Sequence, residues 1–138
     1  MTMIAKNKIP PFDAQFLEAI SRILGDTDTG LTGSEIGCLL SNSRIPDTSP
    51  SLTKWRRLLN AFVDFQNEHQ MGNHVLLFMK RAMDPARYLE QSTAFHARRN
   101  RLNPLLSLRG MTIGEDGEIR RVDSARTVDQ ALERANRL

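Results

Sequence analysis

A chain of 138 residues, 40% of them apolar, is long enough to bury a hydrophobic core and fits a single domain. Its single cysteine excludes an internal disulfide and favours a reducing compartment. The chain begins without the apolar run of a signal peptide, and no stretch approaches the roughly 20 apolar residues of a membrane span. These features predict a soluble cytoplasmic protein with no membrane partner.

The net charge of +3 is unevenly distributed along the chain. Residues 51–110 hold ten basic and four acidic side chains, whereas acidic side chains slightly outnumber basic ones on either side of this stretch. A pI near 9.5 raises the expectation of an anionic partner such as nucleic acid. Solvated helix faces that bind nothing can have the same composition.

Residues 1–11 are expected to form a flexible arm, because Pro10 and Pro11 disfavour a helix. The helical domain is then expected to span residues 12–138. Asp13 is suited to cap a first helix that stops at Gly25. The apolar residues of this helix keep helical spacing: Phe16, Leu17, Ile20, Ile23 and Leu24. This pattern predicts a helix that faces the core.

A clear helix start follows at Thr32. Its hydroxyl can accept from the amide of Glu35 while the Glu35 carboxylate reaches back to the amide of Thr32, which is a capping box. The helix is expected to end at residues 41–43. Cys38 lies beside its apolar residues and is expected to be a small buried hydrophobe.

A longer helix is predicted next, with Ser49 as N-cap and Pro50 at the first helical position. It carries the only tryptophan of the chain on an apolar stripe: Trp55, Leu58, Leu59, Phe62 and Val63. This spacing is typical of a helix with one buried face. Three basic residues lie off the stripe: Lys54, Arg56 and Arg57.

Two shorter helices are expected to follow. The nearly continuous apolar run from Val75 to Met79, which extends through Met83, is typical of a helix in the middle of a core. Asp84-Pro85 then stops this helix and starts a brief one, with the aspartate as cap and the proline as first residue. The brief helix carries Tyr88 and Leu89.

A fifth helix is expected to begin near Ser92. Its apolar residues are expected on one side: Phe95, Leu102, Leu105, Leu106 and Leu108. Its first turns are basic: His96, Arg98, Arg99 and Arg101. Pro104 lies inside the helix and removes one backbone hydrogen bond, which predicts a kink or a break near Asn103.

The periodicity then changes to that of strands. Residues 111–113 and 118–122 flank a Gly-Glu-Asp-Gly turn, which predicts a β-hairpin that leans on helices. A capping-box pattern at Thr127 opens a last helix whose apolar stripe still runs at Leu138. We therefore expect the chain to be the front part of a longer protein.

The sequence contains no convincing pattern for catalysis, a cofactor or a metal. His69 and His74 are five residues apart, not the four that place two imidazoles on one helix face. The stretch from Gly30 to Gly37 lacks the Gly-Lys-Ser/Thr end of a P-loop, so Gly33 and Gly37 are expected to permit close helix packing. The Arg-plus-His pair of HEPN ribonucleases is also missing. We therefore expect a non-enzymatic chain.

The best functional candidate is a set of basic residues on two helices, whose basic ends converge if both helices pack on one core: Lys54, Arg56, Arg57, Arg98, Arg99 and Arg101. Guanidinium groups can engage phosphates bidentately, and about six contacts would support salt-sensitive binding of nucleic acid. Alternatively these groups are solvated or pair within the chain, for instance Arg57 with Asp64. The loop from Ser41 to Thr48 is too long for a helix-turn-helix.

The same residues carry a resemblance to one protein family. The stretches are LTGSEIGCLL, IPD, TKWRRLLNAF, MDPARY, RLNPLLSLRGMTIGEDGEIRRV and TVDQALERANRL. Together they resemble the N-terminal region of Ymh-type hypothetical proteins, which are prokaryotic proteins linked with abortive-infection phage defence. The resemblance covers nearly the whole chain from about Phe12 and implies a part in antiviral defence. The HEPN-like C-terminal half of that family is expected to be absent here, and no residue role is carried over.

These observations predict a mainly helical single domain of five to six helices with one small β-hairpin near residues 111–122. Its core is expected to contain Trp55, Leu58, Phe62, Leu76, Phe78 and Leu102. One function consistent with the sequence is a non-enzymatic regulatory or sensor module that binds nucleic acid through its basic face. The alternative is a protein-interaction or oligomerisation module that uses leftover apolar surface.

Overall fold

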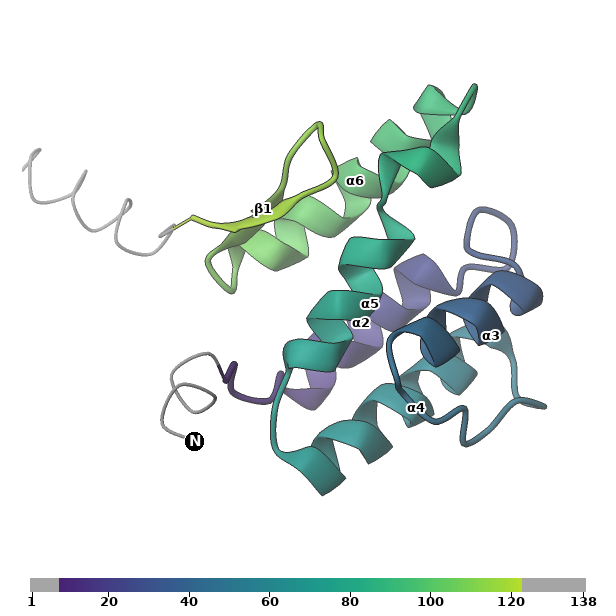
Figure 1. Ribbon diagram of the computed structural model, residues 1–138, viewed down its shortest axis with the longest axis vertical. Helices are drawn as coiled ribbons and strands as arrows, with labels where there is room; N and C mark the ends of the chain where they lie inside the picture. Colours follow the sequence, from purple (N-terminus) through teal and green to yellow (C-terminus); the bar gives the residue numbers. More distant parts are fainter. Residues whose placement is uncertain (1–7, 123–138) are drawn as a thin grey trace, which may run out of the picture. The chain divides into compact units, whose positions relative to one another are not determined.

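A computed structural model of the chain describes residues 8–122 (Figure 1). In chain order these residues form α2 (Ala14–Leu24), α3 (Gly33–Asn42), α4 (Lys54–His69), α5 (Asn73–Ala82), the 3-10 helix η1 (Pro85–Tyr88), α6 (Ser92–Ser107), β1 (Met111–Ile113) and β2 (Ile119–Arg121). The prediction of a mainly helical fold with one small hairpin is confirmed. The first part of the expected arm and the helix expected after Thr127 lie outside the described residues.

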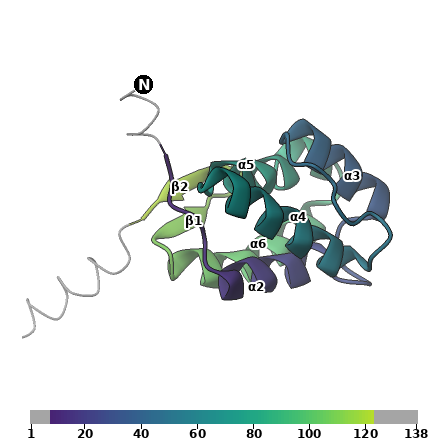
Figure 2. The same cartoon turned by 90° about the horizontal axis from the view of Figure 1, so that it is seen from below.

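The chain divides into two compact units, Met1–Ala82 and Met83–Leu138, called here the first and the second unit. The first unit holds the helices α2 to α5, and the second holds η1, α6 and the hairpin (Figure 2). Within the first unit α2 packs against α4, and within the second unit α6 lies along β1.

The predicted starts of α2 and α3 are confirmed. Asp13 caps α2 by accepting a hydrogen bond from the amide of Phe16. At the start of α3 the amide of Glu35 donates to the Thr32 hydroxyl at 3.1 Å, and the amide of Thr32 donates to the Glu35 carboxylate at 2.8 Å. Gly25 ends α2 as expected.

The predicted start of α4 is wrong. Thr53, not Ser49, is the N-cap residue, and its side chain makes no capping hydrogen bond. The carbonyl of Ser49 instead accepts from the amide of Leu52 in a turn, and the Ser49 hydroxyl accepts from the side-chain amide of Asn60 at 3.2 Å. A hydroxyl held by α4 in this way does not serve as the cap of the same helix.

The end of the expected arm is docked on the first unit. The amide of Ile9 donates to the side chain of Asn73 at 2.7 Å, and the carbonyl of Ile9 accepts from the amide of Gly72 at 2.8 Å. Phe12 exchanges two hydrogen bonds with the buried amide side chain of Gln66, at 3.0 and 2.8 Å. Residues 9–12 are therefore tied to α4 and to the start of α5.

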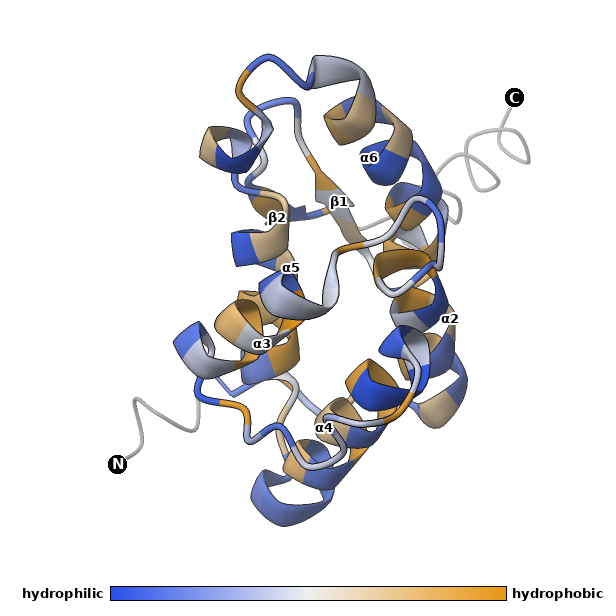
Figure 3. Cartoon of the chain, turned by 90° about the vertical axis from the view of Figure 1, so that its right-hand side faces the viewer, coloured by the Kyte–Doolittle hydropathy of each residue, from blue (hydrophilic) through white to orange (hydrophobic). Residues whose placement is uncertain are grey.

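Four of the predicted core residues are fully buried: Leu58, Phe62, Phe78 and Leu102. Trp55 and Leu76 are only half-buried. The buried face of α4 is centred further along the helix, on Ala61, Phe62 and Phe65, and Figure 3 shows both hydrophobic and hydrophilic stretches on α4. Trp55 lies on the same side of α4 two turns before Phe62, at the N-terminal end of this face, and its ring is therefore only half-buried.

The prediction that Cys38 is buried is wrong, because its side chain is exposed. The buried residues of α3 are Ile36, Leu39 and Leu40. At about 3.6 residues per turn, Cys38 lies on the opposite side of the helix from Ile36 and Leu40.

The second unit begins with the predicted short helix. The Asp84 side chain accepts from the amide of Ala86, and Pro85 occupies the first helical position of η1. α6 then continues through Pro104 to Ser107, so the expected break is absent. Asn100, whose carbonyl loses its helical donor at Pro104, is exposed, and water can satisfy that carbonyl.

The hairpin forms at the predicted place, and its two strands pair with Ile113 opposite Ile119. Its turn is closed by Gly117, which has φ of +78° and lies against residues 83–85. A Cβ at Gly117 would lie 2.5 Å from the carbonyl oxygen of Met83 and 2.7 Å from Cδ of Pro85. Only glycine fits this turn, because it allows both the left-handed conformation and the close approach.

Candidate nucleic-acid interface

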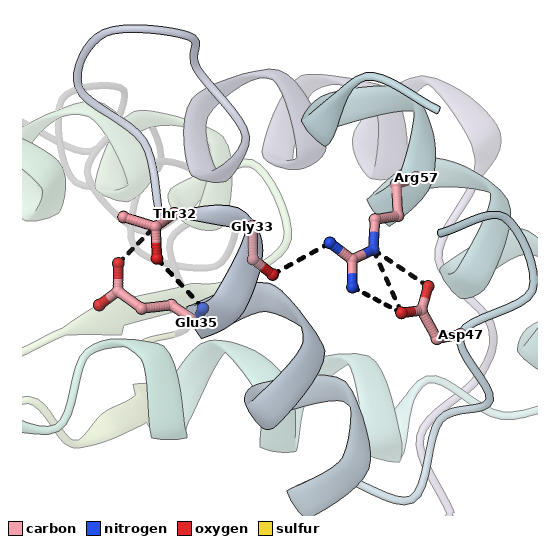
Figure 4. Close-up of polar contacts among 5 residues, drawn as sticks. All are labelled: Thr32, Gly33, Glu35, Asp47 and Arg57. Carbon is pink, nitrogen blue, oxygen red and sulfur yellow. Dashed lines mark hydrogen bonds and ion pairs between the residues drawn. The ribbon is translucent and has the colours of Figure 1, made fainter. Parts of the chain in front are cut away.

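Arg57 is an internal connector of the first unit (Figure 4). Its Nη2 lies 2.6 Å from Oδ2 of Asp47, its Nε donates to both carboxylate oxygens at 3.1 and 3.2 Å, and its Nη1 donates to the carbonyl of Gly33 at 3.0 Å. The side chains of Arg57 and Asp47 are only 13% and 27% exposed. The hydrogen bond and charge of Asp47 raise the pKa of Arg57 against the opposing effect of burial.

This geometry changes the interpretation of two sequence features. The partner of Arg57 is Asp47 in the loop after α3, not Asp64 on its own helix. Gly37 leaves space for the guanidinium, since a Cβ there would lie 3.1 Å from Nη2 of Arg57. Arg57 therefore joins α3, the following loop and α4, and it is not a surface cation.

The other two basic residues at the start of α4 lie around Trp55. The guanidinium carbon of Arg56 is 5.1 Å from the centre of the Trp55 ring, and that of Arg22 on α2 is 3.9 Å away. Nζ of Lys54 donates to the carbonyl of Thr27 at 3.4 Å, in the loop that follows α2. We call Arg22, Lys54, Trp55 and Arg56 the Trp55 cluster.

Helix packing brings the Trp55 cluster together. Gly25 admits the backbone of α4, since a Cβ there would lie 2.6 Å from the backbone nitrogen of Trp55. Arg22, one turn before Gly25, therefore reaches the tryptophan ring. Sequence reasoning missed Arg22, and the only signal for it was the glycine at the end of α2.

The Trp55 cluster is accessible and mostly cationic. Arg22 and Arg56 are exposed, and Lys54 and Trp55 are half-buried. Glu18 is the one carboxylate paired with the cluster in the described part of the chain, 3.1 Å from Nε of Arg22. The first unit holds nine basic and eight acidic side chains, so any strong attraction of this unit for phosphates must come from a local cluster such as this one.

The arginines of α6 do not form one surface. At about 3.6 residues per turn, Arg98 and Arg99 lie on opposite flanks of the buried stripe of the helix. Nη1 of Arg98 donates to the Tyr88 hydroxyl at 2.6 Å, whereas Nε of Arg99 donates to the Ile113 carbonyl at 2.7 Å. Arg101 is exposed. Two of these three predicted site residues thus support the second unit itself.

The six predicted residues are therefore divided. Lys54 and Arg56 belong to the Trp55 cluster, while Arg57 forms an internal ion pair of the same unit. The three arginines of α6 belong to the second unit. The predicted meeting of the two basic helix ends stays a prediction.

The two histidines near the end of α4 flank Phe65. Their rings lie 4.3 Å (His69) and 4.4 Å (His74) from the ring of Phe65. Nδ1 of His74 is buried without a hydrogen-bond partner, and burial, followed by the charges of His69 and Arg44, lowers the pKa of His74. Within residues 8–122 no three His, Cys, Asp or Glu side chains are grouped so that they could hold a metal ion.

Comparison of this chain with models of protein families, with characterised proteins and with solved structures found no match. Among the helices that the structure describes, none has the length and apolar character needed to cross a membrane.

Proposed function

We propose that this chain is a non-enzymatic regulatory or sensor module that binds nucleic acid through the Trp55 cluster. The observation that supports the proposal is the placement of two guanidinium groups, Arg22 and Arg56, over the half-buried Trp55 at the contact of α2 with α4. The adjacent Lys54, whose Nζ donates to the Thr27 carbonyl, adds a third cation. Phosphates attract the cations, and tryptophan and arginine planes offer surfaces for stacking of unpaired bases.

The resemblance to Ymh-type proteins is the ground for proposing that such binding serves phage defence. The single cysteine fits a reducing compartment, and we place the proposed action in the cytoplasm on that ground. The Trp55 cluster supplies a small number of phosphate contacts, so binding should be modest and should weaken with salt. For about three contacts to a single strand, the slope of log K against log salt is about −2.

The proposal is tested by titrating the whole chain with a labelled oligothymidylate and, separately, a labelled oligouridylate. Anisotropy of the label measures affinity, and the emission of the only tryptophan measures events at the cluster itself. We expect binding that falls with salt and a change in Trp55 emission that follows the same curve. The proposed function would be refuted if neither the oligothymidylate nor the oligouridylate showed salt-sensitive binding.

A matched pair of double variants locates the site. Arg22→Gln with Arg56→Gln removes two cations from the cluster, and Arg44→Gln with Arg81→Gln removes two exposed cations elsewhere in the first unit. The first pair should reduce the salt slope by about 1.4, because each phosphate contact to a single strand contributes about 0.7. The second pair should change it little. Equal effects of the two pairs would show general attraction without a site at Trp55.

A protein-interaction function is the alternative, and exposed apolar side chains of the second unit favour it. Leu89 is 76% exposed and Leu108 is 72% exposed. The sequence placed Leu108 on the apolar side of the fifth helix, so its exposure differs from that prediction. The two functions use different units of the chain and do not exclude each other.

A further inference from the structure

Among residues 8–122, nothing pairs with the backbone groups on the outer edge of β2 in the second unit. In the antiparallel pair, Ile113 is opposite Ile119, and the amide of Gly114 donates to the carbonyl of Glu118 at 2.9 Å. Bonded and non-bonded pairs alternate along such a ladder. The N–H and C=O groups of Ile119 and Arg121 therefore point away from β1.

The corresponding edge of β1 is covered by α6. The side chain of Asn103 accepts from the amide of Ile113 at 2.7 Å and donates to its carbonyl at 3.1 Å. Nε of Arg99 donates to the same carbonyl at 2.7 Å. Two side chains of α6 thus take the place of a neighbouring strand on this edge.

No residue in the range 8–122 does the same for β2. Nothing in that part of the chain bonds to the outward backbone groups of Ile119 or Arg121, and Arg121 is exposed with no carboxylate partner there. The adjacent Arg120 is paired with Asp116, 2.6 Å away, which leaves Arg121 as the cation of β2 that has no carboxylate partner among residues 8–122. An edge of this kind is a template for another strand.

We propose that the outer edge of β2 binds an extended acidic segment of a partner protein by strand addition. Backbone hydrogen bonds to Ile119 and Arg121 would fix the register of the segment against β2. A carboxylate of the segment would pair with Arg121. Val122, which is 41% exposed at the end of the strand, offers an apolar contact to an alternating side chain.

The charge of the edge argues against a second copy of the same strand. Antiparallel pairing of β2 with β2 would bring the arginines at positions 120 and 121 of two chains together, and like charges across strands are destabilising. An acidic segment reverses this effect. The structure therefore favours a partner with glutamate or aspartate in an extended stretch.

The test uses the whole chain and a labelled hexapeptide of alternating glutamate and valine, acetylated and amidated at its ends. We expect saturable binding by anisotropy. We also expect at least about fivefold weaker binding of the same peptide with its central valine replaced by proline, which removes one backbone donor. A peptide of alternating lysine and valine should not bind.

Two substitutions at one exposed position separate charge from backbone pairing. Arg121→Gln removes the charge, and Arg121→Pro removes the charge and an outward N–H that the hairpin itself does not use. The proline variant should bind the acidic peptide about fivefold more weakly than the glutamine variant. Exchange protection of the Gly114 and Val122 amides confirms that each hairpin is intact.

Equal affinities of the glutamine and proline variants, with both hairpins intact, would overturn strand addition at this edge. Saturable binding of the lysine peptide would overturn the proposal that the partner segment is acidic. So would a dimer of the chain that the substitution Arg121→Pro abolishes. These outcomes are independent of the Trp55 cluster, because the Arg22 and Arg56 variants leave the hairpin sequence unchanged.

Discussion

Arg57 shows how one basic residue among three neighbours becomes structural. The first turn of α4 carries three basic residues, Lys54, Arg56 and Arg57. Only Arg57 bonds to Asp47 and to the carbonyl at the start of α3. Its charge is largely buried and is paired with the Asp47 carboxylate and the Gly33 carbonyl. The two neighbours remain at the surface around Trp55, where solvent screens them and any single pair is worth about 0–1 kcal/mol.

The substitution Arg57→Gln should lower the free energy of unfolding by about 2 kcal/mol, between the effects of surface and of fully buried ion pairs. The reason is that Asp47 and the Gly33 carbonyl lose their donor. Urea denaturation followed by Trp55 emission measures the effect in the first unit. Arg56→Gln is the control and should cost less than about 1 kcal/mol; equal losses would show that the Asp47 pair does not stabilise the fold.

His74 should make the stability of the first unit depend on pH. Because burial lowers its pKa below the usual 6.5, the unfolded chain binds a proton that the folded chain resists. The free energy of unfolding should therefore fall as the pH drops through 6.5, and level off only below the folded-state pKa.

Denaturation curves on both sides of pH 6.5 measure this dependence. His74→Gln should flatten it, whereas the substitution of exposed His96 by glutamine should leave it unchanged. A pH dependence that persists in the His74 variant would assign the effect to another group.

At the scale of elements, the second unit depends on how its hairpin meets the helices around it. α6 supplies Asn103 and Arg99 to one edge of β1, and the turn at Gly117 lies against residues 83–85. Asp116 and Arg120 add an exposed ion pair across the turn, and the hydrogen bond from Arg120 holds the pKa of Asp116 well below its usual range. Two short strands gain support in this way.

Gly117→Ala should destabilise the hairpin by about 2 kcal/mol, because alanine there combines a left-handed φ with a clash against the Met83 carbonyl. Gly110→Ala is a matched control. Its φ of +72° imposes a similar backbone cost, but its Cβ would meet only the carbonyl of Val122, at 3.0 Å.

Amide exchange at Gly114 reports on both variants, since this amide donates to Glu118 across the turn. The loss of protection should be larger for Gly117→Ala than for Gly110→Ala. Equal losses would mean that the contact with residues 83–85 adds nothing to the cost of the left-handed φ.

At the scale of the whole molecule, the chain offers one optical reporter in each unit. Its only tryptophan is in the first unit and its only tyrosine, Tyr88, is in the second. The two proposed surfaces divide in the same way, with cations around Trp55 in one unit and an open strand edge at β2 in the other. Binding of nucleic acid and of an acidic peptide can therefore be measured on the same chain and assigned separately.

Local sequence signals were enough to predict several elements of this fold. The capping box at Thr32, the aspartate caps at residues 13 and 84 and the hairpin turn all form as predicted, because their hydrogen bonds join residues two to four positions apart. Helical periodicity also identified four members of the core. The local capping signal at Ser49 failed, because its hydroxyl accepts a hydrogen bond from Asn60 on α4 and Thr53 is the N-cap instead.

Tertiary packing distinguishes the cations at the surface from those that are internal. Arg57 meets Asp47 ten residues earlier, Arg22 reaches Trp55 across two packed helices, and Arg99 holds a strand. A pattern of charges on one helix cannot distinguish these cases, since all three residues lie beside apolar stripes. The distinction depends on which acceptor or aromatic ring the packing brings within about 3 to 5 Å of each cation. The reason is that hydrogen-bond and Coulomb energies weaken as that distance grows.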